Sequence, residues 1–260
     1  MRLTFLGTGA AMPLPTRHQT GLLFQGGEEP LLVDCGAGVL HRLARTRVGH
    51  EGVSTVLLTH HHLDHVADLL PLLKARWLAG EDDLTVAGPT GTADLVRDLL
   101  DAHDYLRGRV DLTLREVEPE GFEVAGYRVR ARETTHSMHC LAYRLHVAAH
   151  DDAGDGERRP PTVTVSGDGE ADPGLVEFAD GSALFVHDCS FPDGVEVSNH
   201  PTPARLGETV ADADADLGRL YLTHLYPHAD GEEESMVASV RERFDGDVRV
   251  AEDMHTVSVE

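Results

Sequence analysis

The chain has 260 residues, of which 22 are basic and 45 acidic, so its formal net charge is −23. This length allows a sizeable core and fits one large domain or two small ones, of which we predict a single domain over residues 1–260. The absence of a signal-peptide pattern and of any apolar run near the ~18 residues of a membrane span predicts a cytoplasmic protein without a membrane partner. The three cysteines cannot all pair, which argues against a disulfide framework.

The acidic composition has a pattern of its own. Lys74 is the one lysine, and all other basic residues are arginine. Such a surface stays hydrated when salt shortens the Debye length to ~3 Å at about 1 M, so the composition is typical of a halophilic protein. The alternative is an ordinary acidic protein. The sequence shows no basic patch that would predict a nucleic-acid groove.

The predicted elements alternate between apolar strands and amphipathic helices. Strands are predicted at 2–6, 20–25, 30–34, 53–59, 84–88, 110–117, 122–132, 141–148, 162–166, 183–187, 219–223 and 247–251. Helices are predicted at 37–47, 64–79, 91–106, 203–216 and 231–244, and a polar loop at 149–161. Strands that are each followed by helices indicate layered sheets flanked by helices.

The motif HHHLDH, which begins at His60, follows an apolar strand and precedes a predicted helix. Because side chains alternate along a strand, we expect His60 and His62 to point the same way and His61 to point away. Asp64 and His65 enter the helix and turn towards a second point nearby. Imidazole and carboxylate groups suit zinc, while nickel, iron and manganese also fit by ligand type. A solvated histidine-rich loop is the alternative.

Further ligand candidates stand just after other predicted strands, where loops gather at one edge of a sheet. They are His136 in the stretch ETTHS, Asp168 in VSGDG and His224 in YLTHL. Each one alone could be a structural residue, but together with HHHLDH they predict a metal centre.

The HHHLDH stretch resembles the HxHxDH motif of the metallo-β-lactamase superfamily. The accessory motifs LLVDCG, SGD, LTH and AED occur in the family's order, and the resemblance covers nearly the whole chain. The opening LTFLGTGAAMPLPTRHQT and the stretches HSMHCLAYRL and VHDCSF resemble the ribonuclease Z branch and its small phosphodiesterase relatives. The resemblance implies an α/β fold, the αββα four-layer sandwich, with a dinuclear metal site.

The resemblance also implies how two divalent ions, most simply Zn²⁺, would be held by each chain. One ion would be bound by His60, His62 and His136, the second by Asp64, His65 and His224, with Asp168 bridging both. His139 is the rival to His136, which matches the family's spacing to the following Tyr143 better. Asp34 resembles an aspartate that orients the motif loop without binding metal, although a turn aspartate is the alternative.

Two ions about 3.5–4 Å apart would activate a bridging hydroxide and neutralise charge in the transition state. The catalytic candidates are Asp64, which would orient that hydroxide, and His200, which would protonate the leaving group. His200 stands where the ribonuclease Z branch has a His-Ser-Thr motif; the alternative is a histidine at the start of a helix, with Thr202 as N-cap. Asp188 replaces a usual glutamate and could hydrogen-bond His200 or His224, or be a turn residue.

These features predict a metal-dependent hydrolase, a ribonuclease Z-like phosphodiesterase acting on a small phosphodiester or a single-stranded nucleic acid. The insertion that grips the tRNA elbow in the short-form enzymes would lie between His136 and Asp168, which here are 32 positions apart with an acidic loop between them. We therefore do not expect tRNA 3′-processing. The alternatives are a hydrolase of an aryl sulfate, lactone, thioester or β-lactam, and a non-catalytic metal-binding subunit. The family expectation is a homodimer.

Overall fold

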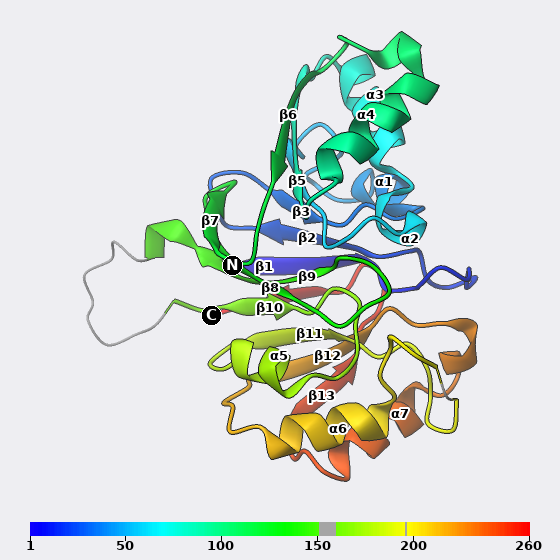
Figure 1. The fold of residues 1–260 in the computed structure, drawn as a ribbon, viewed down its shortest axis with the longest axis vertical. Coiled ribbons are helices and arrows are strands. Elements are labelled where there is room, and N and C mark those ends of the chain that lie inside the picture. The colour runs from blue at the N-terminus through cyan, green and yellow to red at the C-terminus, as the bar shows by residue number, and fades with distance from the viewer. Residues whose placement is uncertain (151–159, 196) are drawn as a thin grey trace.

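The chain folds into layers in the order helix, sheet, sheet, helix. The computed structural model describes residues 1–150, 160–195 and 197–260. Within these residues two mixed β-sheets lie face to face, with helices α1–α4 over the outer face of one sheet and α5–α7 over the other (Figure 1). This is the αββα sandwich that the sequence predicts, so the fold prediction is confirmed.

The first sheet contains the N-terminal strands and the last strand of the chain. Its order is β14-β1-β2-β3-β4-β5-β6, antiparallel from β14 to β3 and parallel from β3 to β6. The bounds are Arg2–Gly7 (β1), Gly21–Gln25 (β2), Leu31–Val33 (β3), Thr55–Leu57 (β4), Asp83–Gly88 (β5), Asp111–Glu116 (β6) and Thr256–Ser258 (β14).

The second sheet contains the remaining strands. Its order is β13-β12-β11-β10-β9-β8-β7, parallel from β13 to β10 and antiparallel from β10 to β7. The bounds are Gly121–Val124 (β7), Tyr127–Glu133 (β8), Leu141–Val147 (β9), Val163–Val165 (β10), Leu184–Asp188 (β11), Arg219–Thr223 (β12) and Asp247–Val250 (β13).

The helices connect the parallel strands and cover the outer faces of the sheets. The α-helices are Val39–Leu43 (α1), Leu63–Val66 (α2), Leu69–Ala79 (α3), Thr92–Ala102 (α4), Pro173–Phe178 (α5), Pro203–Asp212 (α6) and Glu233–Arg241 (α7). Short 3-10 helices lie at Asp104–Leu106 (η1), Ala148–His150 (η2) and Pro227–Ala229 (η3). Among the described residues, each helix is too short or too polar to span a lipid bilayer.

Apolar side chains fill the space between the sheets and the spaces under the helices. In β2, Leu22 and Phe24 belong to the core between the sheets, whereas Leu23 belongs to the core under the first helical layer. Strands that are buried on both faces read as continuous apolar runs, which explains why GLLF and PLLV were recognised as strands. A third apolar cluster, which includes Leu206 and Val240, fills the space under α5–α7.

The predicted helix over 64–79 is wrong in one respect, because the structure divides it into α2 and α3. Pro71 explains the break. Within a continuous helix its ring would clash with the carbonyl group of Ala67, and it has no N–H to donate to that group. In α3 it occupies the first turn, where the missing N–H costs nothing.

The predicted strand over 122–132 is also wrong as a single element. The chain reverses between β7 and β8, where Ala125 and Gly126 both have positive φ. The sequence alternates apolar and polar residues through this hairpin, so the pattern alone did not reveal the turn. Helix α5 and strand β14 were not predicted, and most of the predicted loop 149–161 lies outside the described residues.

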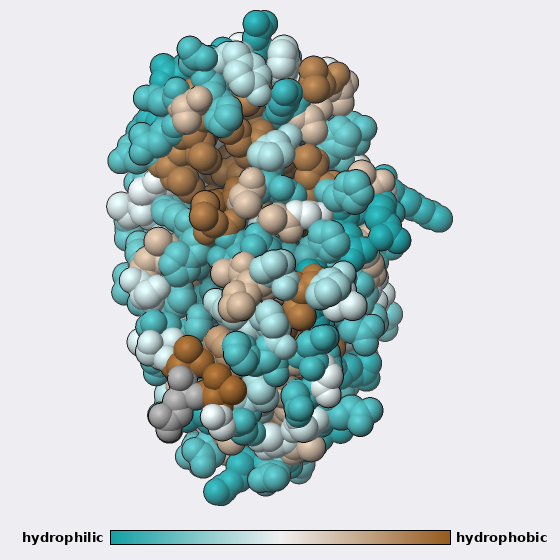
Figure 2. Space-filling model, turned by 90° about the vertical axis from the view of Figure 1, so that its right-hand side faces the viewer, coloured by the Kyte–Doolittle hydropathy of each residue, from teal (hydrophilic) through white to brown (hydrophobic). Residues whose placement is uncertain are grey.

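The face that lies at the right of Figure 1 is shown in Figure 2. It is largely hydrophilic, with a hydrophobic area in its upper half, where the helices of the first layer lie. Exposed large hydrophobic side chains on these helices are Leu63 of α2 and Leu78 of α3.

Two statements about the architecture stay predictions, namely that the protein is a homodimer and that residues 1–260 form a single domain.

Candidate metal centre

The site is built from loops that follow neighbouring strands. Asp34 follows β3, the HHHLDH motif follows β4, Asp168 follows β10, Asp188 ends β11 and His224 follows β12. The carboxyl ends of parallel strands meet at one edge of each sheet, where such loops converge. The two sheets bring their loops to the same edge of the sandwich.

Three histidines and an aspartate form the first group of side chains. Nδ1 of His62 lies 3.1 Å from Nε2 of His60 and 3.2 Å from Nε2 of His136. Oδ2 of Asp168 lies 3.6 Å from Nε2 of His60. His60 and Asp168 are buried, while His62 and His136 are partly exposed. The strand argument for His60 and His62 was wrong in detail, because β4 ends at Leu57, yet the loop still brings both rings together.

The second group is fully buried and shares Asp168 with the first. Nε2 of His224 lies 3.1 Å from Oδ2 of Asp64 and 3.1 Å from Oδ2 of Asp168. Nε2 of His65 lies 3.3 Å from Oδ1 of Asp168. All the residues predicted to hold metal are therefore brought into one continuous cluster.

Asp34 orients two of these histidines. Its carboxylate accepts hydrogen bonds from Nδ1 of His65 and from the hydroxyl of Thr59, both at 2.8 Å, and from the backbone N–H of Thr59. The Thr59 hydroxyl, which donates to Asp34, accepts from Nδ1 of His60 at 3.0 Å. With their Nδ1 protons held in this way, His60 and His65 both present Nε2 to the centre.

Asp188 orients two further histidines, His200 directly and His224 through the hydroxyl of Ser190. Its Oδ2 accepts from Nδ1 of His200 at 2.7 Å, and its Oδ1 accepts from the hydroxyl of Ser190 at 2.6 Å. That hydroxyl lies 2.9 Å from Nδ1 of His224. The rings of His200 and His224 are stacked, with their centroids 5.3 Å apart. Asp188, His200 and His224 form a third group next to the second.

Charges inside the cluster shift the pKa values in opposite directions. Burial, followed by the neighbouring histidine rings, lowers the pKa of His60 far below its ordinary value, so this ring is neutral. Burial also opposes the charged form of His224, but Asp168, Asp188 and Asp64 outweigh it and raise the pKa of His224 to about 10. Burial raises the pKa of Asp64, but the hydrogen bond with His224 and the charges of His65 and His224 outweigh it and keep that pKa well below its usual range.

Several site residues have unusual backbone conformations. Asp34 (φ 61°), His224 (φ 62°) and Asn199 next to His200 (φ 71°) all lie in the left-handed region. Non-glycine residues seldom adopt this conformation, which costs on the order of 1 kcal/mol and persists where the surrounding contacts fix it. Local backbone strain at these residues therefore accompanies the orientation of their side chains towards the site.

Two histidines close to the motif in sequence lie outside these groups. Nε2 of His61 donates to the hydroxyl of Thr92 at 2.8 Å, consistent with its expected direction away from the site. His139 lies 3.5 Å from a carboxylate oxygen of Glu133. Of the two rivals, His136 is the one that joins the cluster.

The donor atoms fit divalent cations. The nitrogen and oxygen atoms of the cluster lie 3.1–3.8 Å apart. These distances are close to the distance of about 3.3 Å between two ligand atoms of a tetrahedral zinc site. Among the described residues, Nε2 of His65 is buried without a hydrogen-bond partner although Oδ1 of Asp168 is nearby. A cation between these atoms would satisfy both.

Comparison with known proteins gives matches over the whole chain. Ribonuclease Z of Mycobacterium avium is 31% identical over 286 aligned positions, which cover 100% of this chain and 99% of that protein. Ribonuclease Z of Methanopyrus kandleri is 32% identical, with 88% of each chain covered. The family model described as anti-Pycsar protein Apyc1 matches residues 1–85.

Solved structures share the fold. The metallo-β-lactamase fold protein YhfI from Bacillus subtilis superposes with a TM-score of 0.80 at 24% identity, covering 98% of both chains. Zn(2+)-bound PqqB from Methylobacterium extorquens gives 0.76 at 20% identity, and the short form of human tRNase Z gives 0.74 at 22%, both covering 100% of both chains.

Full-length identity to ribonuclease Z, together with this fold and its clustered histidines and aspartates, defines a hydrolase of the metallo-β-lactamase superfamily that depends on divalent metal. The prediction of a metal-dependent hydrolase of ester or phosphodiester bonds is confirmed at this level. Full-length identity above 30% then narrows the class, and the chain belongs to the ribonuclease Z family.

Thr59 and Ser190 belong to the site but were not predicted from the sequence. Both hydroxyls relay a hydrogen bond from a buried aspartate to a histidine. A signal was present, because Thr59 precedes the HHHLDH motif directly and Ser190 lies two residues after Asp188. The guanidinium of Arg17, which lies in the loop after β1, donates to the Thr8 hydroxyl and the Ala251 carbonyl.

Proposed function

We propose that this protein hydrolyses phosphodiester bonds with two zinc ions held on either side of Asp168. The observation that carries the proposal is the position of the Asp168 carboxylate between the two groups of donors. Its Oδ1 faces His65, and its Oδ2 lies near both His60 and His224. Such a carboxylate can bridge two cations.

His60, His62 and His136 would hold one ion, and Asp64, His65 and His224 would hold the other. The donor set of imidazole nitrogens and carboxylate oxygens suits zinc. PqqB from Methylobacterium extorquens, which has the same fold, was solved with Zn(2+) bound. Asp34 and Asp188 would fix the tautomers of the histidine ligands and would not contact the metals.

When bound, a pair of divalent ions activates water, polarises the phosphoryl group and neutralises charge that develops in the transition state. Asp64 would orient the attacking oxygen through its carboxylate. His200 would donate a proton from Nε2 to the leaving oxygen, because Nδ1 is engaged with Asp188. Asp188 would keep the His200 ring charged and correctly turned.

We assign the substrate to small phosphodiesters or single-stranded nucleic acid, and not to precursor tRNA. The relatives named ribonuclease Z support a phosphodiester. The alignment with the Mycobacterium avium protein spans 286 positions, more than the 260 residues of this chain, so that relative has residues without a counterpart here. We place these missing residues in the short segment between His136 and Asp168.

A panel of esters assayed in molar KCl tests the proposal. We expect turnover of bis(p-nitrophenyl) phosphate, with little or no turnover of an aryl sulfate, a lactone, a thioester or a β-lactam. Single-stranded RNA and precursor tRNA complete the panel, and we expect cleavage of the former in preference to 3′-end processing of the latter. Turnover restricted to one of the other esters would move the function to that bond.

Matched histidine variants test the site. His60→Ala should abolish turnover, because the variant lacks one ligand of the first ion. The remaining cluster is also destabilised, and both effects remove metal. His61→Ala is the control, because His61 is the adjacent ring but contacts Thr92. It should keep turnover within about threefold of the wild type. Equal loss in both variants would contradict the ligand assignment.

A further inference from the structure

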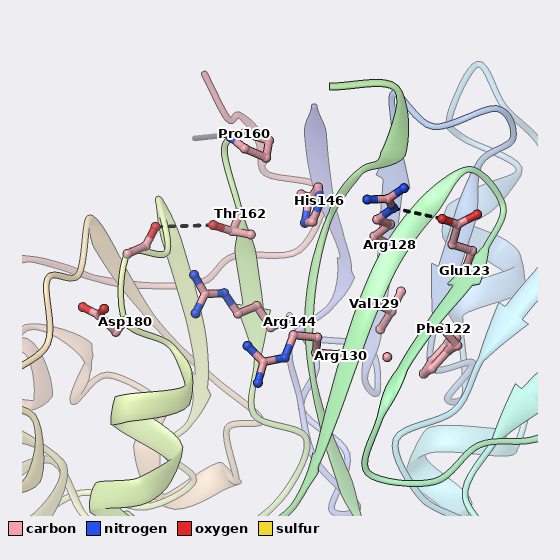
Figure 3. A pocket seen from close by; sticks show the side chains of 12 residues that line it. Phe122, Glu123, Arg128, Val129, Arg130, Arg144, His146, Pro160, Thr162 and Asp180 are labelled. Carbon is pink, nitrogen blue, oxygen red and sulfur yellow. Dashed lines mark hydrogen bonds and ion pairs between the residues drawn. The ribbon is translucent and has the colours of Figure 1, made fainter. Parts of the chain in front are cut away.

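A cavity of about 650 Å³ lies against strands β7, β8 and β9, where Arg130 stands opposite Arg144 in the register (Figure 3). It shares no lining residue with the groups of the metal centre. A hydrogen-bond donor for a phosphoryl group at the metals therefore has to come from side chains that border the cluster itself.

An aromatic pair borders the cluster at His200 and His224. Phe191 lies three residues after β11, and its ring stacks on that of Tyr226, three residues after β12, with the centroids 4.5 Å apart and the planes inclined by 21°. The centroid of the Tyr226 ring lies 6.0 Å from that of His200 and 6.0 Å from that of His224. Tyr226 is thus a neighbour of both the proposed proton donor and a proposed ligand of the second ion.

Backbone and ring contacts fix the position of Tyr226. Its backbone N–H donates to the carbonyl oxygen of Ser190 at 3.0 Å, and the buried ring of Phe191 supports one face of the phenol. The preceding residue, Leu225, donates from its backbone N–H to the carbonyl oxygen of Thr8 at 2.9 Å. A donor that is held in place before the substrate binds needs little reorganisation during the reaction.

The hydroxyl group of Tyr226 has no hydrogen-bond partner within the described residues. Tyrosines with fully buried rings do have one, namely Gly27 for Tyr127, Leu58 for Tyr143 and His255 for Tyr221. Tyr226 is partly exposed, and the charges of Asp64, Asp168 and Asp188 act on its phenol oxygen. This hydroxyl is therefore close to the metal centre and available to a bound molecule.

We propose that the Tyr226 hydroxyl donates a hydrogen bond to a non-bridging oxygen of the substrate phosphoryl group. The inference rests on the proposed phosphodiesterase function. Charge on these oxygens has to be stabilised in the transition state by positioned donors and cations. The histidine ligands direct their nitrogen atoms to the ions, and the proton of His200 goes to the leaving oxygen. Tyr226 supplies a donor that neither of them provides.

Replacement of Tyr226 by Phe removes the hydroxyl and keeps the ring that stacks on Phe191. With bis(p-nitrophenyl) phosphate in molar KCl, we expect kcat to fall by about 10–100-fold and KM to change by less than about threefold, because the bond is strongest in the transition state. Metal content and Tm should match those of the wild type. The control is Tyr105→Phe in η1, outside the groups of the metal centre, which should keep kcat within about twofold.

A chiral phosphorothioate diester gives a readout that a merely structural role of Tyr226 would not change. In each enantiomer of methyl p-nitrophenyl phosphorothioate, sulfur, a weak hydrogen-bond acceptor, replaces a different non-bridging oxygen. Where sulfur faces Tyr226 there is little hydrogen bond to lose, so Tyr226→Phe should slow that enantiomer by less than about threefold. The other enantiomer should show the full loss. Equal losses with both enantiomers would overturn the proposal.

Equilibrium dialysis of the metal-loaded protein with orthovanadate tests the contact without turnover. Vanadate adopts the five-coordinate geometry of the transition state, so Tyr226→Phe should bind it about tenfold more weakly, whereas Tyr105→Phe should bind it like the wild type. A wild type that cleaves no phosphodiester would contradict the proposed function, and the dialysis would then decide the role of the hydroxyl. Unchanged vanadate affinity in a folded Tyr226→Phe variant would overturn that role.

Discussion

Nδ1 of His200 lies 2.7 Å from Oδ2 of Asp188, a carboxylate with no solvent exposure. Burial by itself lowers the pKa of His200, but the hydrogen bond from this ring to Asp188 outweighs burial and raises the pKa above its ordinary value. The same carboxylate reaches His224 through Ser190. One buried aspartate therefore connects the proposed proton donor with a proposed metal ligand.

Replacement of Asp188 by Asn should move the pH dependence of turnover. A general acid works while it is protonated, and a raised pKa extends that form to higher pH. Without the carboxylate, burial dominates and the pKa of His200 falls, so the alkaline loss of activity should begin at lower pH. With an alkyl phosphodiester, whose leaving group needs the proton, we expect kcat to fall by about 10–100-fold. Asp193→Asn, which changes an exposed carboxylate, is the control. An unshifted alkaline limb would exclude this role of Asp188.

Removal of the His200 ring should affect poor leaving groups most. For His200→Ala we expect a loss of about 10²–10⁴-fold with an alkyl phosphodiester, because an alkoxide must be protonated as it leaves. With p-nitrophenolate as the leaving group, the loss should be roughly tenfold or less. Metal content, measured on the same samples, should be unchanged. Equal losses with both substrates would show that His200 acts in some way other than as a proton donor.

Metal binding should release protons, and the two proposed sites should differ in this respect. In the metal-free protein the pKa of His224 is raised to about 10, so the ring is protonated at pH 7.5 and must lose that proton to bind metal. The pKa of His60 is lowered, so the first site has no such barrier there. Affinity at the second site should therefore rise with pH between about 6 and 9.

Titration calorimetry in two buffers of different ionisation enthalpy measures this release. The heat of metal binding at the second site should depend on the buffer, and the heat of binding at the first site should depend on it much less. Heats that are independent of the buffer in both phases would contradict the protonation states described above.

The protein should be more stable in concentrated salt than in dilute buffer. Its net charge of −23 destabilises the compact state by self-repulsion, and salt screens that repulsion. We expect Tm to rise between about 0.2 M and 2 M KCl, with a larger rise than for a protein of near-zero charge. A Tm that stays constant or falls over this range would contradict the halophilic interpretation of the composition.

The sequence predicted the layered fold and the residues of the cluster because both leave local signals. Apolar runs reveal strands that are buried on both faces. The HHHLDH motif, Asp168 and His224 follow such strands within three residues, where loops converge, whereas His136 follows β8, which alternates buried and exposed residues. The break between α2 and α3 could have been predicted as well, because Pro71 is incompatible with a continuous helix.

Other features depend on tertiary structure and could not be predicted from the pattern. The relays through Thr59 and Ser190 require the loops after different strands to pack against each other. The hairpin between β7 and β8 interrupts an alternation that continues through the turn. The pairing of Arg130 with Arg144 follows from the register of two strands, which no single stretch of sequence records.

The proposed function requires Asp168 to lie between two bound ions. Anomalous diffraction from a metal-replete crystal, measured on both sides of the zinc absorption edge, tests it most directly. We expect two peaks about 3.5–4 Å apart, one next to His60, His62 and His136 and the other next to Asp64, His65 and His224. A single peak, or two peaks that do not share Asp168, would contradict it.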